Sequence, residues 1–167
     1  MTPQESQRFD EADQLYRRAL EIKERLGLQR DAASDYHQLG RIAQDRQRFD
    51  EAEQWYRKAL EIFERLGHPP HSVQTLAQLG VLRRQQGRPV DAVSWFGKAL
   101  AIAAQYGMQR LAVQILVDLA RLMRALGEEQ FSAAWRQAFD GQEPPLARLR
   151  DILQELEGSD AEGSGAG

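Results

Sequence analysis

The chain has 167 residues, of which 42% are hydrophobic and 28% are charged, and its formal net charge at pH 7 is −3. This balance is typical of one soluble domain with a hydrophobic core, and it excludes a disordered chain. The absence of cysteine excludes disulfides, thiol nucleophiles and thiolate metal sites. Because nucleic-acid-binding proteins usually carry a basic excess, the negative charge argues against a nucleic-acid partner.

The sequence carries no signal for membrane insertion or secretion. No apolar run approaches the roughly 18 residues that span a bilayer. The first ten residues, MTPQESQRFD, lack the basic and then apolar order of a secretory signal. We therefore expect a cytoplasmic protein that does not bind a membrane.

A 40-residue repeat organises most of the chain. The copies are RFDEADQLYRRALEIKERLG from Arg8, RFDEAEQWYRKALEIFERLG from Arg48 and RPVDAVSWFGKALAIAAQYG from Arg88. Many positions keep this register, among them Ala12, Ala52 and Ala92; Ala19, Ala59 and Ala99; Leu20, Leu60 and Leu100; and Gly27, Gly67 and Gly107. The repeat predicts one domain over residues 1–157, with units at about 8–27, 32–67, 72–107 and 110–140.

The first predicted helix covers residues 9–26 and corresponds to the second helix of a unit. No first helix precedes it in the sequence, so its face around Phe9, Tyr16 and Leu20 lacks half of its usual cover. Either the neighbouring helix at 32–46 buries most of this face, or the face associates with a second copy or a partner. Both alternatives remain open at this point.

Each later unit is predicted to contain a shorter and a longer helix. The shorter one carries Tyr36, Leu39, Gly40 and Ala43 at helical spacing. The longer one carries a second such face, made of Ala52, Trp55, Tyr56, Ala59, Leu60 and Phe63. Small residues such as Gly40 and Ala52 are expected where two helices approach closely.

Local signals also predict where the longer helix begins and ends. Asp50 precedes its apolar positions and Glu53 follows three residues later, which is the pattern of a capping box. Gly67 follows the helix, where a residue in the left-handed conformation is expected.

The C-terminal part differs from the repeats. Residues 113–123 are apolar almost all round, so we expect this helix to be covered on more than one side, in part by the short helix around Phe131, Trp135 and Phe139. After the Pro144–Pro145 break, residues 145–157 read as an amphipathic capping helix. The remainder, 158–167, is predicted to be a disordered tail.

The repeat residues resemble the tetratricopeptide repeat. A large residue, a leucine and then Gly or Ala in the first helix, followed by Ala-x-x-x-Tyr-x-x-Ala-Leu in the second, is the pattern that carries this resemblance over about residues 8–139. The 40-residue period is longer than the usual ~34 residues of the family. In this respect the repeat resembles the longer repeats of kinesin light chains and bacterial regulators. The resemblance implies an all-α, right-handed superhelical solenoid of antiparallel helix pairs, without enzymatic activity.

The resemblance also implies that one face of each first helix lines a concave groove. Carried over to this chain, the groove residues are His37, Gln38, Arg41, Gln78, Val81, Arg84, Val117, Asp118, Arg121 and Arg124. The Lys and Asn residues with which some family members hold the C-terminal carboxylate of a chaperone are absent, because His37, Arg41 and Gln78 stand in their places. The arginines favour an acidic or carboxylate-bearing peptide, since a guanidinium binds a carboxylate through two hydrogen bonds. The alternative is that they are solvated surface.

Nothing in the sequence indicates catalysis, a cofactor or a tightly bound metal. His68 and His71 flank Pro69–Pro70 without an evident third ligand, so they read as loop residues, and His37 stands alone on its helix. No glycine-rich phosphate loop and no nucleophile elbow is present. The tryptophans Trp55, Trp95 and Trp135 recur with the repeat and are predicted to lie in the core.

Three functions are compatible with these features. The first hypothesis is an adaptor that binds a peptide or protein segment in its groove. The second is a scaffold that forms homodimers through its N-terminal helix. The third is a module that senses a small signalling peptide for a regulator, as some bacterial relatives of this repeat do.

Overall fold

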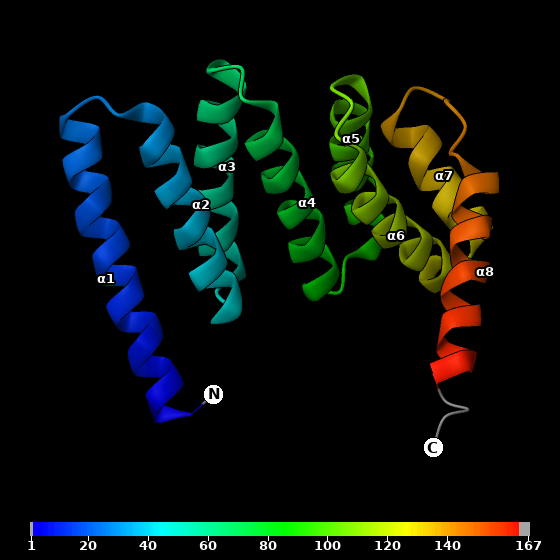
Figure 1. Cartoon of the computed structure of the whole chain (residues 1–167), viewed down its shortest axis with the longest axis horizontal. Coiled ribbons are helices and arrows are strands. Elements are labelled where there is room, and N and C mark those ends of the chain that lie inside the picture. The colour runs from blue at the N-terminus through cyan, green and yellow to red at the C-terminus, as the bar shows by residue number, and fades with distance from the viewer. Residues whose placement is uncertain (1, 164–167) are drawn as a thin grey trace. The chain divides into compact units, whose positions relative to one another are not determined.

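The computed structural model describes residues 2–163, which form eight helices and no strand. They are α1 (Pro3–Arg25), α2 (Gln29–Asp45), α3 (Phe49–Arg65), α4 (Pro69–Gln85), α5 (Pro89–Gln105), α6 (Gln109–Leu126), α7 (Glu128–Ala138) and α8 (Leu146–Gly163) (Figure 1). The chain divides into two compact units, Met1–Leu82 and Arg83–Gly167. The predicted all-α fold of consecutive, paired helices is confirmed, whereas the single domain over residues 1–157 stays a prediction.

Short turns of one conformation join the first six helices. The middle residue of each turn has a positive φ, and these residues are Gly27 (71°), Gln47 (57°), Gly67 (63°), Gly87 (70°) and Gly107 (64°). Glycine adopts this left-handed conformation without steric cost, so the expected end of the helix before Gly67 is confirmed. Gln47 adopts the same left-handed conformation although it is not a glycine. A search of the sequence for glycines therefore misses this turn.

Two local predictions about the repeat helices are wrong. In the second and third repeats the first and second helices are equally long, since α2, α3, α4 and α5 each have 17 residues. In the fourth repeat the first helix, α6, is the longer one, with 18 residues against 11 in α7. Asp50 and Glu53 do not form a capping box, because α3 begins at Phe49, one residue before Asp50. A capping box is present instead at the start of α1, where the Thr2 amide donates to Glu5 Oε2 (2.7 Å) and the Glu5 amide donates to Thr2 Oγ1 (3.2 Å).

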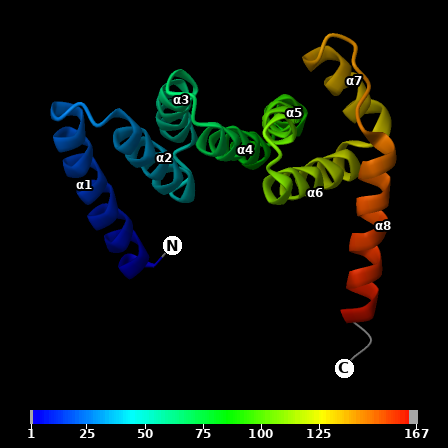
Figure 2. The same ribbon diagram turned by 45° about the horizontal axis from the view of Figure 1, so that its top comes forward.

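Neighbouring helices pack in chain order within each unit. In the first unit α1 packs on α2 and α2 packs on α3, and in the second unit α5 packs on α6 and α7 (Figures 1 and 2). Helix α6 also contacts α7 and α8. The prediction that residues 113–123 are covered on several sides is therefore confirmed.

Helix α8 is longer than the predicted capping helix. It continues to Gly163 instead of ending at 157, so the first part of the predicted disordered tail is helical. Residues 164–167 of that tail lie outside the described residues. None of the helices in the described part of the chain has the length and apolar character needed to cross a bilayer.

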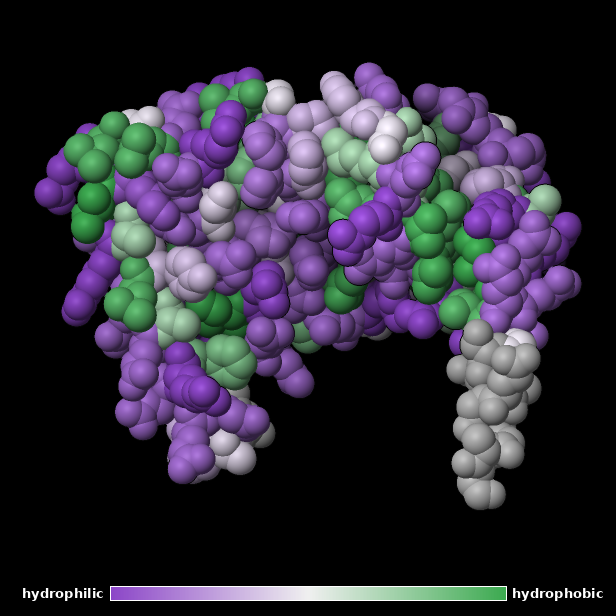
Figure 3. Space-filling model, viewed as in Figure 1, coloured by the Kyte–Doolittle hydropathy of each residue, from purple (hydrophilic) through white to green (hydrophobic). Residues whose placement is uncertain are grey.

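Helix α1 leaves a hydrophobic strip on the surface of the first unit (Figure 3). Leu15 is 65% exposed, Ile22 is 55% exposed and Leu26 is 65% exposed. These residues follow one another at spacings of seven and four, which places them on one side of the helix. We call Leu15, Ile22 and Leu26 the α1 strip.

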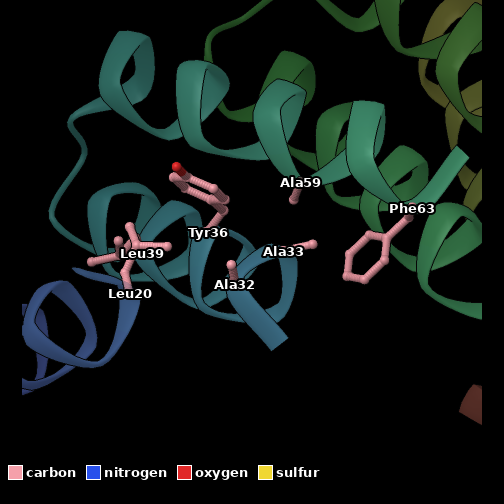
Figure 4. Packing of buried hydrophobic residues seen from close by; sticks show 7 residues of the cluster. All are labelled: Leu20, Ala32, Ala33, Tyr36, Leu39, Ala59 and Phe63. Carbon is pink, nitrogen blue, oxygen red and sulfur yellow. The ribbon is translucent and has the colours of Figure 1, made fainter. Parts of the chain in front are cut away.

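The opposite side of α1 belongs to the core of the first unit. Leu20 is only 7% exposed and packs in a cluster to which α2 and α3 also contribute, made of Leu20, Ala32, Ala33, Tyr36, Leu39, Ala59 and Phe63 (Figure 4). Burying a leucine of this kind contributes about 1.5–3 kcal/mol. Leu20 is therefore unavailable for the self-association predicted for it, while Phe9 and Tyr16 are half-buried.

The small residues allow α2 and α3 to approach closely, as predicted. A Cβ atom at Gly40 would lie 2.7 Å from Cδ1 and Cε1 of Tyr56, a distance at which atoms overlap. The Tyr56 ring is fully buried, and its hydroxyl donates to Gln44 Oε1 at 2.6 Å. Ala52 and Ala59 of α3 are also fully buried.

Candidate peptide-binding face

The predicted groove residues lie on the first helices α2, α4 and α6, with five of them in each unit. The first set is His37, Gln38, Arg41, Gln78 and Val81, and the second is Arg84, Val117, Asp118, Arg121 and Arg124. The four arginines are exposed and the other six residues are half-buried. We call each set the first-helix face of its unit.

His37 joins two first helices of the first unit. Its Nδ1 atom lies 3.0 Å from the Thr75 hydroxyl, which itself donates to the carbonyl oxygen of His71 at 2.8 Å. The Thr75 oxygen therefore accepts from His37, which places the imidazole proton on Nδ1. The ring also packs against Tyr56, with ring centroids 5.3 Å apart.

The surroundings of His37 keep its ring neutral. Burial lowers the pKa of His37 to about 4, and the positive charge of Arg41, followed by that of His71, acts in the same direction. At neutral pH the side chain is an uncharged link between α2 and α4. Arg41 is exposed beside it and forms no ion pair with any described residue.

Three arginines and one aspartate form the charged part of the second face. Arg84 Nη1, from the last turn of α4, lies 3.6 Å from Asp118 Oδ1 on α6. Burial raises the pKa of the Asp118 carboxyl, although the charges of Arg84 and Arg121 lower it. With Arg124 in the last turn of α6, the described charges of this face sum to a positive value.

An apolar surface adjoins this charged cluster. Val117 is half-buried on α6, and Val113, one turn earlier on the same helix, is 52% exposed. Val117 was predicted from the sequence to lie on this face, whereas Val113 and Thr75 were not. The helical spacing of Val113 and Val117 was a usable signal, whereas no sequence pattern pairs Thr75 with His37.

The two remaining histidines form a pair and are not isolated loop residues. Their Nδ1 atoms are 2.7 Å apart, and the ring of His71 packs against Phe63 with centroids 4.8 Å apart. Burial lowers the pKa of His71, and the charges of His68 and Arg30 add to this effect. No group of three or more His, Asp or Glu side chains among the described residues is arranged to hold a metal ion.

The tryptophans are only partly a core feature, which corrects the prediction. Trp135 is buried, but Trp55 and Trp95 are half-buried and each is covered by a cation. Lys58 Nζ lies 5.0 Å from the Trp55 ring centroid, and Lys98 Nζ lies 5.1 Å from that of Trp95. Such contacts shield an aromatic face while the cation stays hydrated.

Comparisons with known proteins agree with this architecture. The sequence model described as "Tetratricopeptide repeat" matches residues 4–65, and a second model with the same description matches residues 75–107. The first match covers α1, α2 and α3, and the second covers most of α4 and all of α5. No curated protein matches the sequence.

Solved structures provide three similar folds. BtubC (BKLC) from P. vanneervenii is 26% identical with a TM-score of 0.65, and the match covers 90% of this chain and 59% of that one. The nearly identical TPR-like repeats of a Podosopora anserina protein, described as a "putative kinesin light chain", are 18% identical with a TM-score of 0.62, and the match covers 92% of this chain and 71% of that one. The apo form of RapI is 16% identical with a TM-score of 0.56, covering 90% and 65%.

The last two similarities concern the fold alone, and this chain spans only 59% of the length of BtubC. The two sequence-model matches nevertheless fall on the repeats that the 40-residue register defines, and all three solved structures share the arrangement of the helices. The chain belongs to the tetratricopeptide repeat family.

Proposed function

We propose that the first-helix faces bind an extended segment of another protein that carries carboxylates. Tetratricopeptide repeats typically mediate contacts between proteins and generally do not catalyse reactions. The observation that carries the proposal is the arginine cluster around Asp118, which is locally positive in a chain with a net charge of −3.

The chemistry of the face suits such a ligand. Arg84, Arg121 and Arg124 are exposed guanidinium groups, each able to bind a carboxylate through two hydrogen bonds. Val113 and Val117 offer apolar surface on the same helix. Exposed ion pairs contribute only about 0–1 kcal/mol each and are screened by salt, so we expect modest, salt-sensitive affinity.

Neutralising two of these arginines should weaken binding. Fluorescence anisotropy with a rhodamine-labelled peptide of alternating glutamate and leucine, the Glu–Leu peptide, measures the effect. The double variant Arg84→Gln with Arg121→Gln is expected to bind it up to about tenfold more weakly at low salt, because two ion pairs are lost.

The matched control is Arg110→Gln with Arg148→Gln, which removes the same charge from exposed positions near the starts of α6 and α8. A peptide in which glutamine replaces glutamate reports binding that does not depend on charge. The proposal is wrong if the two double variants bind the Glu–Leu peptide equally well, or if wild-type protein does not prefer it to the glutamine peptide.

The exposure of the α1 strip favours a second candidate function, self-association through α1. Leu15 and Ile22 correspond in the repeat to Trp55 and Ile62 of α3, which pack against the core cluster of the first unit. In α1 the same positions are exposed. Because burying such side chains contributes about 1.5–3 kcal/mol each before entropic costs, a second copy of α1 would gain from covering them.

Removing the apolar groups of the α1 strip should therefore shift the protein toward monomer. The variant Leu15→Gln with Ile22→Gln is expected to lower the average mass measured by sedimentation equilibrium, with its helical circular dichroism unchanged. The control, Leu66→Gln with Tyr106→Gln, changes the exposed residues that correspond to Leu26. A wild-type protein that is monomeric at high micromolar concentration would rule out this homodimer.

If the protein senses a small signalling peptide, as in the third hypothesis, this shorter ligand would bind to the same first-helix faces. The arginine variants test it as well, because a short acidic peptide would lose the same ion pairs.

A further inference from the structure

Asp118 is the carboxylate that lies beside Arg84 on the first-helix face of the second unit. Its side chain is 22% exposed, compared with 40% for Arg84, so the carboxylate lies deeper in the face than the guanidinium. The 3.6 Å between Arg84 Nη1 and Asp118 Oδ1 is longer than a hydrogen bond. The two groups thus neutralise each other without the directional contact that would hold them together.

Two charged groups act on the Asp118 carboxylate, Arg84 from α4 and Arg121 from the next turn of α6. The described parts of α5, α7 and α8, which also pack on α6, add no further charge to these two. Burial raises the pKa of the Asp118 carboxyl even with both cations present. The ionised form of Asp118 is therefore costly, and the arginines only partly offset this cost.

A ligand carboxylate at Arg84 would change this balance. Two carboxylates that share one guanidinium repel each other, and such pairs relieve the repulsion when one of them takes up a proton. Asp118 is the group prepared to do so, because it is the more buried of the two and would lose part of its cationic support. The ligand carboxylate, which is nearer to solvent, would keep its charge.

We propose that Asp118 is an internal competitor of the ligand: in the free protein its carboxylate neutralises Arg84, and a ligand carboxylate binds by replacing it while Asp118 takes up a proton from solvent. This inference rests on the proposed function, since it concerns the same face and the same class of ligand. It makes acidity a regulator of binding, with tighter binding at lower pH.

The test compares wild type, Asp118→Asn and Arg84→Gln with the Glu–Leu peptide between about pH 5.5 and 7.5. The glutamates of the peptide have a pKa of about 4.3 and remain mostly ionised over this range. Anisotropy gives the affinities, and calorimetry in two buffers of different ionisation enthalpy counts the protons taken up on binding. Asp118→Ser serves as a second variant in case asparagine disturbs the packing.

Wild type is expected to bind roughly three- to tenfold more tightly at pH 5.5 than at 7.5, with proton uptake. Asp118→Asn should bind at pH 7.5 about as tightly as wild type does at pH 5.5, with neither the pH dependence nor the uptake. Arg84→Gln should weaken binding, because it removes the group for which both carboxylates compete.

Two results would contradict this proposal, and they are distinguishable from each other. If Arg84→Gln weakens binding while both Asp118 variants bind as wild type does or more weakly, Asp118 is not a competitor, and the proposed function stands. If wild type binds the glutamine peptide as tightly as the Glu–Leu peptide, the face does not recognise carboxylates, and both proposals fail.

Discussion

Gly40→Ala is expected to lower the free energy of unfolding of the first unit by about 1–3 kcal/mol, although alanine is the stronger helix former. The added methyl group would lie 2.7 Å from two carbon atoms of the Tyr56 ring. That ring cannot easily give way, because it is fully buried and its hydroxyl is hydrogen-bonded to Gln44. Helices α2 and α3 must therefore separate. Urea unfolding followed by circular dichroism measures the loss.

Gly158→Ala is the matched control, since it makes the same chemical change in a helix without a neighbour within 4 Å of the new Cβ. It should leave stability unchanged or raise it by up to about 1 kcal/mol, because alanine lowers the backbone entropy of the unfolded chain. If Gly40→Ala were as stable as Gly158→Ala, a Cβ atom at position 40 would not meet the Tyr56 ring, and α2 and α3 would not be in close contact.

The free energy of unfolding is expected to fall as the pH is lowered from about 7 to 4, and His37 should account for up to about 3 kcal/mol of the loss. The pKa of His37 in the folded protein is about 4, below its ordinary value of 6.5. Between these values the unfolded chain binds a proton that the folded chain does not. The contribution of His37 is therefore complete above about pH 6.5 and declines as the pH falls toward 4.

His37→Gln separates this contribution from those of other groups. The variant cannot take up the proton, so its stability should depend less steeply on pH between 6.5 and 4, whatever its stability at neutral pH. An NMR titration of the imidazole provides a direct measurement. A His37 ring that titrates near 6.5 would show that it is solvated and does not link α2 to Thr75 of α4.

The position of His37 could be predicted from the sequence, but its hydrogen-bond partner could not. Helical spacing was enough to place His37, Arg41 and Arg84 on first helices. It did not predict that His37 is bound to Thr75, or that Arg84 faces Asp118. Each of these contacts joins two residues more than 30 positions apart in the sequence, and it depends on the rotation of each helix and on side-chain rotamers.

The buried side of helix α1 also could not be predicted from the sequence. The repeat predicted an uncovered face around Phe9, Tyr16 and Leu20, but Leu20 is buried against α2 and α3. The exposed large hydrophobic residues of the α1 strip are Leu15, Ile22 and Leu26. Because α1 has apolar residues on two sides, its sequence alone does not show which side packs against α2. Packing against α2 decided that Leu20 is buried and that Leu15 and Ile22 are exposed.

The presence of the helices, their order and the close approach at Gly40 could be predicted from the amino-acid sequence. A 40-residue register, periodic apolar positions and glycines after helices are local features, and helix formation and chain reversal depend mainly on local interactions. The packing of the helices was needed to show which side of α1 is buried, which cations cover Trp55 and Trp95, and which partners His37 and Asp118 have. These outcomes depend on distances between side chains of different helices, and a change of about one residue in helix rotation would exchange the partners.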